Sequence, residues 1–234
     1  MIDIHMHLLY GVDDGAKNLE ESIEMLKDAK QQGIEKCILT PHYRYGMFPY
    51  DKTKIDENFR VLNKEASKIG IEIYVGCEFH VDSNIFEYLQ TERCYTLAKS
   101  SYVLTEYSYG TEYNYIYENT RRLIACGYTP VIAHVERYEC FLKKPALCEE
   151  ISDIGAYLQV NADSILGLVD KKTQKFCKKV LKAGLVDVVA SDCHGINHRI
   201  NNMGKARGFV EKKYGTEYAN YLFLEAPLKI VEDI

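Results

Sequence analysis

Short apolar runs recur along the chain, and each is followed by a polar turn and then by apolar residues at helical spacing. Seven of these runs predict strands: MIDIHMH (1–7), KCILTPH (36–42), IEIYVGCEFH (71–80), SYVLTEYS (101–108), TPVIAHVER (129–137), AYLQVNADS (156–164) and VDVVASDCH (186–194). The spacing between them predicts helices over residues 18–32, 51–69, 112–126, 146–154 and 171–183. Two or three further helices are expected after residue 201, with Thr216 as an N-cap.

Glycine marks the end of each of the five helices just before the next strand, at Gly33, Gly70, Gly127, Gly155 and Gly184. Strands that alternate with helices predict βαβ units and a parallel sheet. The strands are apolar throughout, and the sequence contains no GxGxxG or GxxxxGK[ST] motif. We therefore expect an α/β fold, a distorted seven-stranded TIM-like barrel, formed as one domain over residues 1–234.

The net charge of the chain bears on which kinds of molecule it can bind. A net charge of -5 argues against a general nucleic-acid-binding protein, but it leaves room for a phosphate substrate. No apolar run approaches the ~20 residues that span a bilayer, and the start lacks the basic segment of a signal peptide. Eight cysteines without a CxxC pair favour free thiols in a reducing compartment, so we expect a cytoplasmic protein that is not inserted in a membrane.

Imidazoles and carboxylates gather where the predicted strands end. Asp14 follows the first strand, and the others lie at six of the seven strand ends: His5, His7, His42, Glu78, Glu106, His134, Asp192 and His194. In a parallel barrel these ends meet at one rim. A single histidine or glutamate there is more often a hydrogen-bonded core residue, but nine together would cost several kcal/mol each on burial unless they bind cations.

The kind of ligand suggests the kind of ion. Imidazoles and carboxylates without thiolate suit manganese, iron or zinc better than magnesium or calcium. Nine donors are enough for two or three ions, and such a site is typical of hydrolysis.

These motifs also carry a family resemblance. The chain resembles the polymerase and histidinol phosphatase (PHP) superfamily, and within it the manganese-dependent tyrosine-protein phosphatases encoded with bacterial capsule and exopolysaccharide genes. The matching stretches are MIDIHMHLLYGVDDG, TPHYRYGMF, VGCEFH, TEYS, TPVIAHVERY, QVNADS, ASDCHGINHR and, near the end, NYLFLEAPLKIV. TPVIAHVERY and the DDG after HxH are the most specific of them.

The resemblance implies three metal ions, each with its own ligands. One would be held by His5, His7, Glu78 and Asp192, a second by Glu78, Glu106 and His134, and a third by Asp14, His42 and His194. Arg137 and Arg199 would clamp the phosphate and, with Glu106, are the candidate catalytic residues. Manganese is the implied ion, with iron, zinc and magnesium as alternatives. The implied reaction is direct hydrolysis of phosphotyrosine, without a phosphoenzyme, on a bacterial tyrosine autokinase.

Three alternatives remain open. Cys193 and Arg199 match C-x5-R, the phosphate loop of cysteine-dependent tyrosine phosphatases, although the neighbouring acid would raise the thiol pKa. The same metal site could act on a small phosphate ester such as histidinol phosphate. Alternatively, it could stabilise a module without activity.

His80 and His198 are expected to play a surface or supporting role rather than to bind metal.

Chelation and thiol alkylation distinguish the metal and cysteine mechanisms. We expect EDTA to abolish phosphatase activity and added Mn²⁺ to restore it, because the nucleophile depends on bound cations. Iodoacetamide should leave most of the activity. The opposite pattern, measured in the same phosphotyrosine assay, would assign the chemistry to Cys193.

Overall fold

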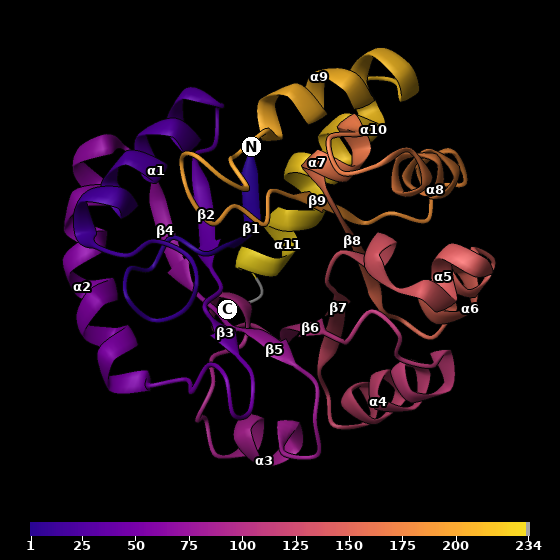
Figure 1. Cartoon of the computed structure of the whole chain (residues 1–234), viewed down its shortest axis with the longest axis horizontal. Helices are drawn as coiled ribbons and strands as arrows, with labels where there is room; N and C mark the ends of the chain where they lie inside the picture. Colours follow the sequence, from indigo (N-terminus) through magenta and orange to yellow (C-terminus); the bar gives the residue numbers. More distant parts are fainter. Residues whose placement is uncertain (233–234) are drawn as a thin grey trace.

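Parallel strands form two hydrogen-bonded sheets that curl around a common centre, with helices on the outside (Figure 1). The computed structural model describes residues 1–232. One sheet has the order β1 (Ile2–Met6), β2 (Lys36–Leu39), β4 (Glu72–Val75). The other has the order β3 (His42–Tyr43), β5 (Glu78–His80), β6 (Tyr102–Glu106), β7 (Thr129–Ile132), β8 (Tyr157–Asn161), β9 (Val188–Ala190). Every pairing is parallel, which confirms the predicted α/β class.

Two of the predicted strands are each interrupted by a kink. Residues 36–42 form β2 and β3, and residues 71–80 form β4 and β5. Pro41 has no N–H to donate, so the ladder cannot continue unbroken through it. Hydrogen bonds still link the two interrupted strands, from Gly76 N to Leu39 O at 2.8 Å and from Glu78 N to Pro41 O at 3.2 Å. The register beyond the kinks places His42 opposite Glu78.

Other strands end earlier than the sequence predicted. The strand expected over 129–137 ends at Ile132, because His134 adopts a left-handed conformation (φ 35°) that begins the 3₁₀ helix η2 (Val135–Arg137). The strands expected over 101–108, 156–164 and 186–194 end at residues 106, 161 and 190. Several polar residues predicted at strand ends therefore lie on the loops that follow.

The five helices expected before glycine are present as α1 (Leu19–Gln31), α2 (Lys52–Ile69), α4 (Tyr113–Ala125), α6 (Leu147–Asp153) and α8 (Lys171–Lys182). Asn18 caps α1 by accepting a 2.9 Å hydrogen bond from the N–H of Glu21. All five stop-glycines have φ between 71° and 102°, the left-handed region that glycine adopts without strain. The glycine rule correctly located these ends.

Other helices fill the connections and the end of the chain. The connections contain α3 (Ile85–Gln90), η1 (Leu97–Lys99), α5 (Glu139–Lys143) and α7 (Ala162–Leu166). The chain closes with α9 (Met203–Tyr214), α10 (Thr216–Asn220), the π-helical turn η3 (Tyr221–Glu225) and α11 (Ala226–Glu232). Thr216 does not cap α10, because Gly215 holds that position and the Thr216 hydroxyl donates to Glu211. Over residues 1–232, no helix combines the length and the apolar character needed to cross a bilayer.

Apolar side chains pack on both faces of the strands. Those facing outward, such as Leu39 and Val160, share a core cluster with helix residues such as Met25 of α1 and Phe176 of α8. Those facing inward, such as Ile4 and Val131, pack against Ile230 of α11, which lies near the centre of Figure 1. Because α11 packs on this inner cluster, the centre of the barrel below the carboxyl ends of the strands is filled by apolar side chains.

The loop after β1 approaches that end closely. A Cβ added to Gly15 would lie 2.1 Å from the backbone oxygen of His7 and 2.6 Å from its Cβ. The close approach is held by a hydrogen bond from Ala16 N to His7 O at 3.1 Å.

We expect Gly15→Ala to lower the free energy of unfolding by roughly 1–3 kcal/mol, because backbone atoms must move to admit the methyl group. Gly208→Ala in α9 is the matched control, since nothing lies within 4 Å of its added Cβ. That change should raise stability by about 0.5–1 kcal/mol through helix propensity alone. Urea unfolding followed by circular dichroism measures both. Equal midpoints for Gly15→Ala and the wild type would contradict the proposed steric constraint.

Candidate metal centre

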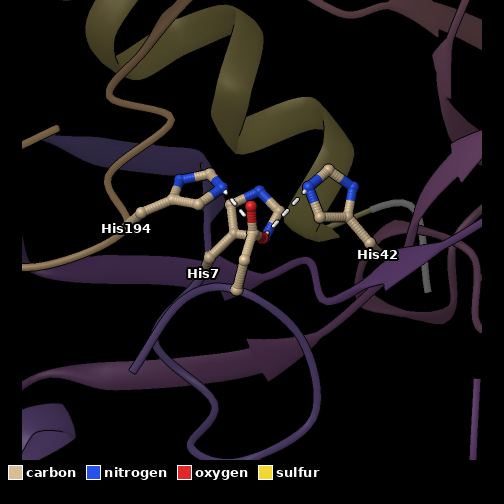
Figure 2. A group of neighbouring side chains, drawn as sticks. His7, His42 and His194 are labelled. Atoms are coloured by element: carbon tan, nitrogen blue, oxygen red, sulfur yellow. Dashed lines mark ion pairs between the residues drawn. The ribbon is translucent and has the colours of Figure 1, made fainter. Parts of the chain in front are cut away.

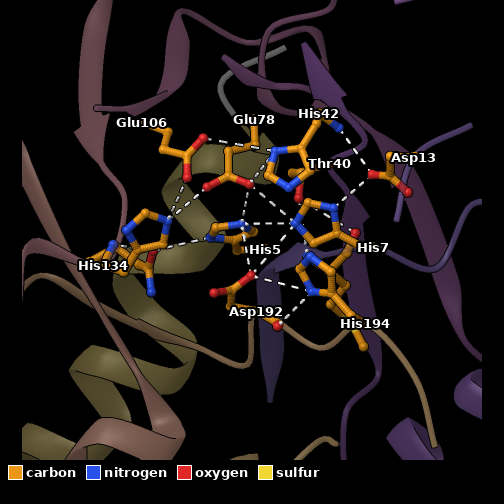
Figure 3. A network of polar contacts seen from close by, with 12 residues as sticks. His5, His7, Asp13, Thr40, His42, Glu78, Glu106, His134, Asp192 and His194 are labelled. Carbon is orange, nitrogen blue, oxygen red and sulfur yellow. Dashed lines mark hydrogen bonds and ion pairs between the residues drawn. The ribbon is translucent and has the colours of Figure 1, made fainter. Parts of the chain in front are cut away.

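The nine side chains predicted as metal ligands lie together at the carboxyl ends of the strands. Figure 3 labels all of them except Asp14. Eight of them fall into three groups whose nitrogen and oxygen atoms lie within 4.8 Å of one another. The groups are His5, His7, Glu78 and Asp192; His7, Asp14, His42 and His194; and His42, Glu78 and Glu106. Because the groups share His7, His42 and Glu78, they form one continuous cluster.

The central group is fully enclosed. Glu78 Oε2 lies 3.2 Å from Nε2 of both His5 and His7, and Asp192 Oδ1 lies 3.5 and 3.6 Å from the same nitrogens. None of the four residues is more than 2 % exposed. Neither carboxylate oxygen accepts a hydrogen bond from any described residue. Two buried, unpartnered carboxylate oxygens beside two imidazoles are costly on their own, and they fit a divalent cation.

The second group is nearer to solvent. Figure 2 shows the rings of His7, His42 and His194 close together. Asp14, which is half exposed, places Oδ1 3.5 Å from His42 Nε2 and 3.4 Å from His194 Nε2. The other nitrogen of His42, Nδ1, lies 3.0 Å from Glu78 Oε2. His42 can thus offer one nitrogen to each of two adjoining positions.

Glu78 also connects the centre to the third group. Its Oε1 lies 2.8 Å from His134 Nε2, and the same nitrogen lies 3.8 Å from Glu106 Oε1. His134 is in none of the three groups, but this contact places it beside the pair of glutamates. Glu78 is therefore the carboxylate best placed to bridge two ions.

The charges of the site perturb its pKa values. Burial alone would lower the pKa of His5, but the carboxylates of Glu78 and Asp192 outweigh it and raise that pKa to about 9. Burial favours the neutral acid in Glu78, yet the neighbouring His5 and His42 hold its pKa well below the usual value. Burial and the charge of Glu78 raise the pKa of Glu106 to about 7. The buried carboxylates therefore favour positive charge beside them, which the imidazoles or a bound cation can supply.

Three residues that the sequence did not single out orient the imidazoles. Asp13 Oδ2 accepts hydrogen bonds from His7 Nδ1 at 2.8 Å and from the backbone N–H of His42 at 3.0 Å. Gln159 Oε1 accepts from His5 Nδ1 at 3.2 Å, and its amide donates to Asn161 at 2.7 Å. Such contacts at Nδ1 leave the Nε2 lone pairs facing the centre. The signal in the sequence was the first acid of DDG and the polar residues at alternate positions of QVNADS.

Both predicted arginines contact the outer oxygen of Asp192. Arg137 Nη2 lies 2.7 Å and Arg199 Nη2 lies 2.6 Å from Oδ2, and their side chains are 26 % and 39 % exposed. Both line a cavity of ≈ 300 Å³, together with Tyr109 and Val169. This cavity therefore has two guanidinium groups in its wall, a suitable arrangement for a phosphate.

The backbone is strained at the same place. Among the six non-glycine residues of 1–232 with positive φ are His134 at 35°, Asp192 at 53° and Arg199 at 45°. The left-handed conformation costs such residues about 1–3 kcal/mol, and it persists where the surroundings impose it. At each of these three positions the left-handed conformation turns the backbone, and the residue there is a metal-ligand candidate or one of the two arginines.

The structure argues against the cysteine alternative. Cys193 is 2 % exposed, its thiol donates to Gly195 O at 3.5 Å, and burial raises the pKa of the thiol well above its usual value. A buried, protonated thiol cannot act as the nucleophile of a phosphate loop. His80 contacts Ser108 Oγ at 3.2 Å and His198 is exposed. Neither histidine belongs to the metal-ligand groups found in residues 1–232.

Comparison with known proteins gives an independent result. The family model described as "Capsular polysaccharide synthesis, CpsB/CapC" matches residues 1–232. The chain is 35 % identical over 240 residues to the tyrosine-protein phosphatase CpsB of Streptococcus pneumoniae, covering 100 % of this chain and 99 % of that protein. It is 32 % identical over 230 residues to the tyrosine-protein phosphatase YwqE of Bacillus subtilis, covering 97 % and 91 %.

Solved structures agree with the sequence comparison. A chain from the crystal structures of YwqE from Bacillus subtilis and CpsB from Streptococcus pneumoniae, described as metal-dependent tyrosine phosphatases, matches with a TM-score of 0.93 and 31 % identity, over 100 % of this chain and 95 % of that one. The phosphotriesterase homology protein of Escherichia coli, at 14 % identity and a TM-score of 0.54 over 98 % and 94 %, shares the fold alone. The chain therefore belongs to the CpsB/CapC family.

Proposed function

We propose that this chain is a metal-dependent protein-tyrosine phosphatase that acts on a bacterial tyrosine autokinase and thereby regulates capsule or exopolysaccharide synthesis. The observation that carries the proposal is the position of the two arginines. Arg137 and Arg199 line a cavity directly against Asp192, whose other carboxylate oxygen faces His5 and His7. A phosphate in the cavity would thus lie beside the cluster of metal-ligand candidates.

The ligand set supports two or three manganese ions per chain. Its donors are imidazoles and carboxylates, and the nearby thiol of Cys193 is directed to a backbone oxygen. As the family resemblance implies, His5, His7, Glu78 and Asp192 would hold the first ion. Glu78, Glu106 and His134 would hold the second. The third would be held by Asp14, His42 and His194. Bound divalent ions would supply hydroxide at neutral pH and neutralise charge on the phosphoryl group.

The arginines and the rim define what the chain itself does. Arg137 and Arg199 would bind the phosphoryl oxygens through paired N–H groups and orient the ester for attack. Tyr109 and Val169 are 61 % and 60 % exposed at this cavity, so they offer apolar surface to an aromatic ring. Glu106, whose Oε1 lies 3.8 Å from His134 Nε2, would act through the second ion that these two residues and Glu78 would hold.

We also infer that the two sheets belong to one distorted seven-stranded barrel. The kinked pairs β2/β3 and β4/β5 each count as one strand in this description. Hydrogen bonds from Asp192 N to His5 O and from His7 N to Cys193 O, both 2.9 Å, support closure between β1 and the segment after β9. We propose a single domain over residues 1–234, of which the last two lie outside the described residues. The eight free cysteines favour a cytoplasmic location.

Substrate preference tests the assignment. With Mn²⁺ present, kcat/KM for a phosphotyrosyl peptide should exceed that for histidinol phosphate by at least about tenfold, because only the aromatic ester can use the apolar rim in the transition state. Steady-state phosphate release measures both. A preference for histidinol phosphate would replace the proposal with the second candidate, a phosphoesterase for small esters, which the ≈ 300 Å³ size of the cavity also accommodates.

A second prediction concerns the hydrogen bond that orients His7. Asp13→Asn should weaken Mn²⁺ binding by about 10–100-fold, because an amide cannot accept at both oxygen positions of Asp13. With its oxygen toward His7 and His42, its NH2 group would face the N–H of Gly15, which Oδ1 accepts at 3.0 Å. Calorimetric titration with Mn²⁺ measures the change. Asp153→Asn, on the exposed face of α6, is the control and should bind as the wild type does. Unaltered affinity in Asp13→Asn would show that this hydrogen bond does not tune the site.

A further inference from the structure

A second concave surface, away from the metal-ligand candidates, is strongly basic. It is a groove of ≈ 630 Å³ between α8, the end of α9 and the segment after α5. Leu142, Pro145, Phe176 and Tyr214 supply its apolar lining. Lysines supply the charge: Lys172, Lys175, Lys178, Lys179, Lys182 and Lys213. We call this surface the lysine groove.

The lysine charges have few acidic neighbours, although Asp170 and Glu139 lie near enough to Lys172 to interact with its charge. The sequence of α8 is KKTQKFCKKVLK, with six lysines and no acidic residue. No lysine of the groove forms an ion pair with another residue in 1–232. Lys178 and Lys213 even converge from different helices, with their Nζ atoms 5.8 and 5.5 Å from the ring centre of Phe209. The groove is therefore a concentrated positive surface on a chain whose net charge is -5.

This arrangement costs helix stability. Lys171 and Lys175, like Lys175 and Lys179, are four residues apart, where like charges destabilise a helix by about 0.2–0.5 kcal/mol per pair. Lys171 and Lys172 also lie in the first turn, at the positive end of the helix dipole. A solvated helix face would gain stability from mixed charges, so the uniform charge favours an anionic ligand.

Both walls of the groove begin near the rim of the candidate metal centre. Val169 lines the cavity of the two arginines, and α8 begins two residues later. On the other side, η2 ends with Arg137, and α5 then leads to Pro145. The twelve residues of α8 extend ~18 Å at 1.5 Å per residue. An extended peptide that leaves the cavity past Val169 would reach Lys172 within a few residues.

We infer that the lysine groove binds an acidic segment of the phosphorylated protein substrate, a few residues from the phosphotyrosine; the inference rests on the proposed function. The shape favours a peptide over a membrane, because a groove with two walls and an apolar floor encloses a chain, whereas a lipid surface is met by a flat or convex face. The charge complementarity favours aspartate- and glutamate-rich sequences.

Peptide kinetics test this inference. Phosphotyrosyl peptides share one core and carry four acidic or four neutral amide residues, placed before or after the phosphotyrosine. The readout is the ratio of kcat/KM for the acidic peptide to that for its neutral counterpart. For the wild type we expect a ratio of about ten or more in low salt for one of the two placements, declining in 0.5 M salt as exposed charges are screened.

Charge reversal on α8 should remove that preference. In the triple variant Lys175→Glu/Lys179→Glu/Lys182→Glu, the ratio should fall to about one or below. The fall should come from a higher KM for the acidic peptide, because three attractive contacts become repulsive. The milder Lys→Gln triple variant should give an intermediate ratio. The control, Lys27→Glu/Arg60→Glu/Lys64→Glu, makes the same change in net charge at exposed positions of α1 and α2, on the opposite side of Figure 1. It should retain the wild-type ratio.

Several outcomes would overturn the inference. They are a wild-type ratio near one and a preference for the acidic peptide that is retained in the α8 variants. An equal loss of that preference in the control variant would also overturn it, because the effect would then come from the overall charge of the protein. Sedimentation with phosphatidylserine vesicles that depends on the α8 lysines, with an unchanged peptide ratio, would assign the surface to a membrane instead.

A binding experiment separates this inference from the proposed function. Fluorescence anisotropy with an unphosphorylated acidic peptide reports on the groove without catalysis. Binding that is lost in the α8 variants, in a protein that hydrolyses no phosphotyrosyl peptide, would reject the proposed function and retain the groove as a peptide site. Hydrolysis without such binding or preference would reject the groove alone.

Discussion

The structure depends on the burial of two carboxylates, Glu78 and Asp192, among imidazoles and guanidinium groups. Both acids are almost completely excluded from solvent, and each keeps one oxygen without a hydrogen bond from the described residues. Such groups are stable only if positive charge is fixed around them. The kinks place the imidazole of His42 opposite Glu78. The left-handed turn at Asp192 likewise directs that carboxylate toward imidazoles and arginines, so both features bring positive groups to a buried acid.

Each of these carboxylates has two different sides. Asp192 directs Oδ1 toward His5 and His7, and its Oδ2 accepts hydrogen bonds from Arg137 and Asn161. The proposed positions of a cation and of the phosphate thus meet at a single residue. Positive charge beside one oxygen of Asp192 weakens the attraction of the other oxygen for its own partners, because the two oxygens share the charge of one carboxylate. Substitution of Asp192 would therefore disturb metal and phosphate positions together, and its effects could not be divided between them.

The sequence predicted those parts of the fold that depend on local rules. Glycine at φ > 0 needs no partner elsewhere in the chain, so the five helix ends were found. The nine ligand candidates were found because polar residues contrast with the apolar strands that carry them. The kink at Gly76 and the left-handed turn at His134 were missed, since their effect depends on neighbouring strands. Asp13 and Gln159 were missed for a similar reason, because they act only through imidazoles that are distant in sequence or on another strand. The ligand roles of the nine residues stay predictions.

The charge distribution constrains how a phosphorylated protein can approach. The chain has 34 acidic and 29 basic residues, and eight of the basic ones are lysines on α8 and at the end of α9. At physiological salt a charge is screened beyond about 8 Å, so an approaching phosphate responds to the local surface rather than to the net charge. A dianion that meets an acidic part of the surface is repelled, whereas one that arrives along α8 meets positive charge close to the rim where Arg137 and Arg199 lie. Selectivity would then arise from the route to the site as well as from the site, which a small ester, with no flanking chain, cannot exploit.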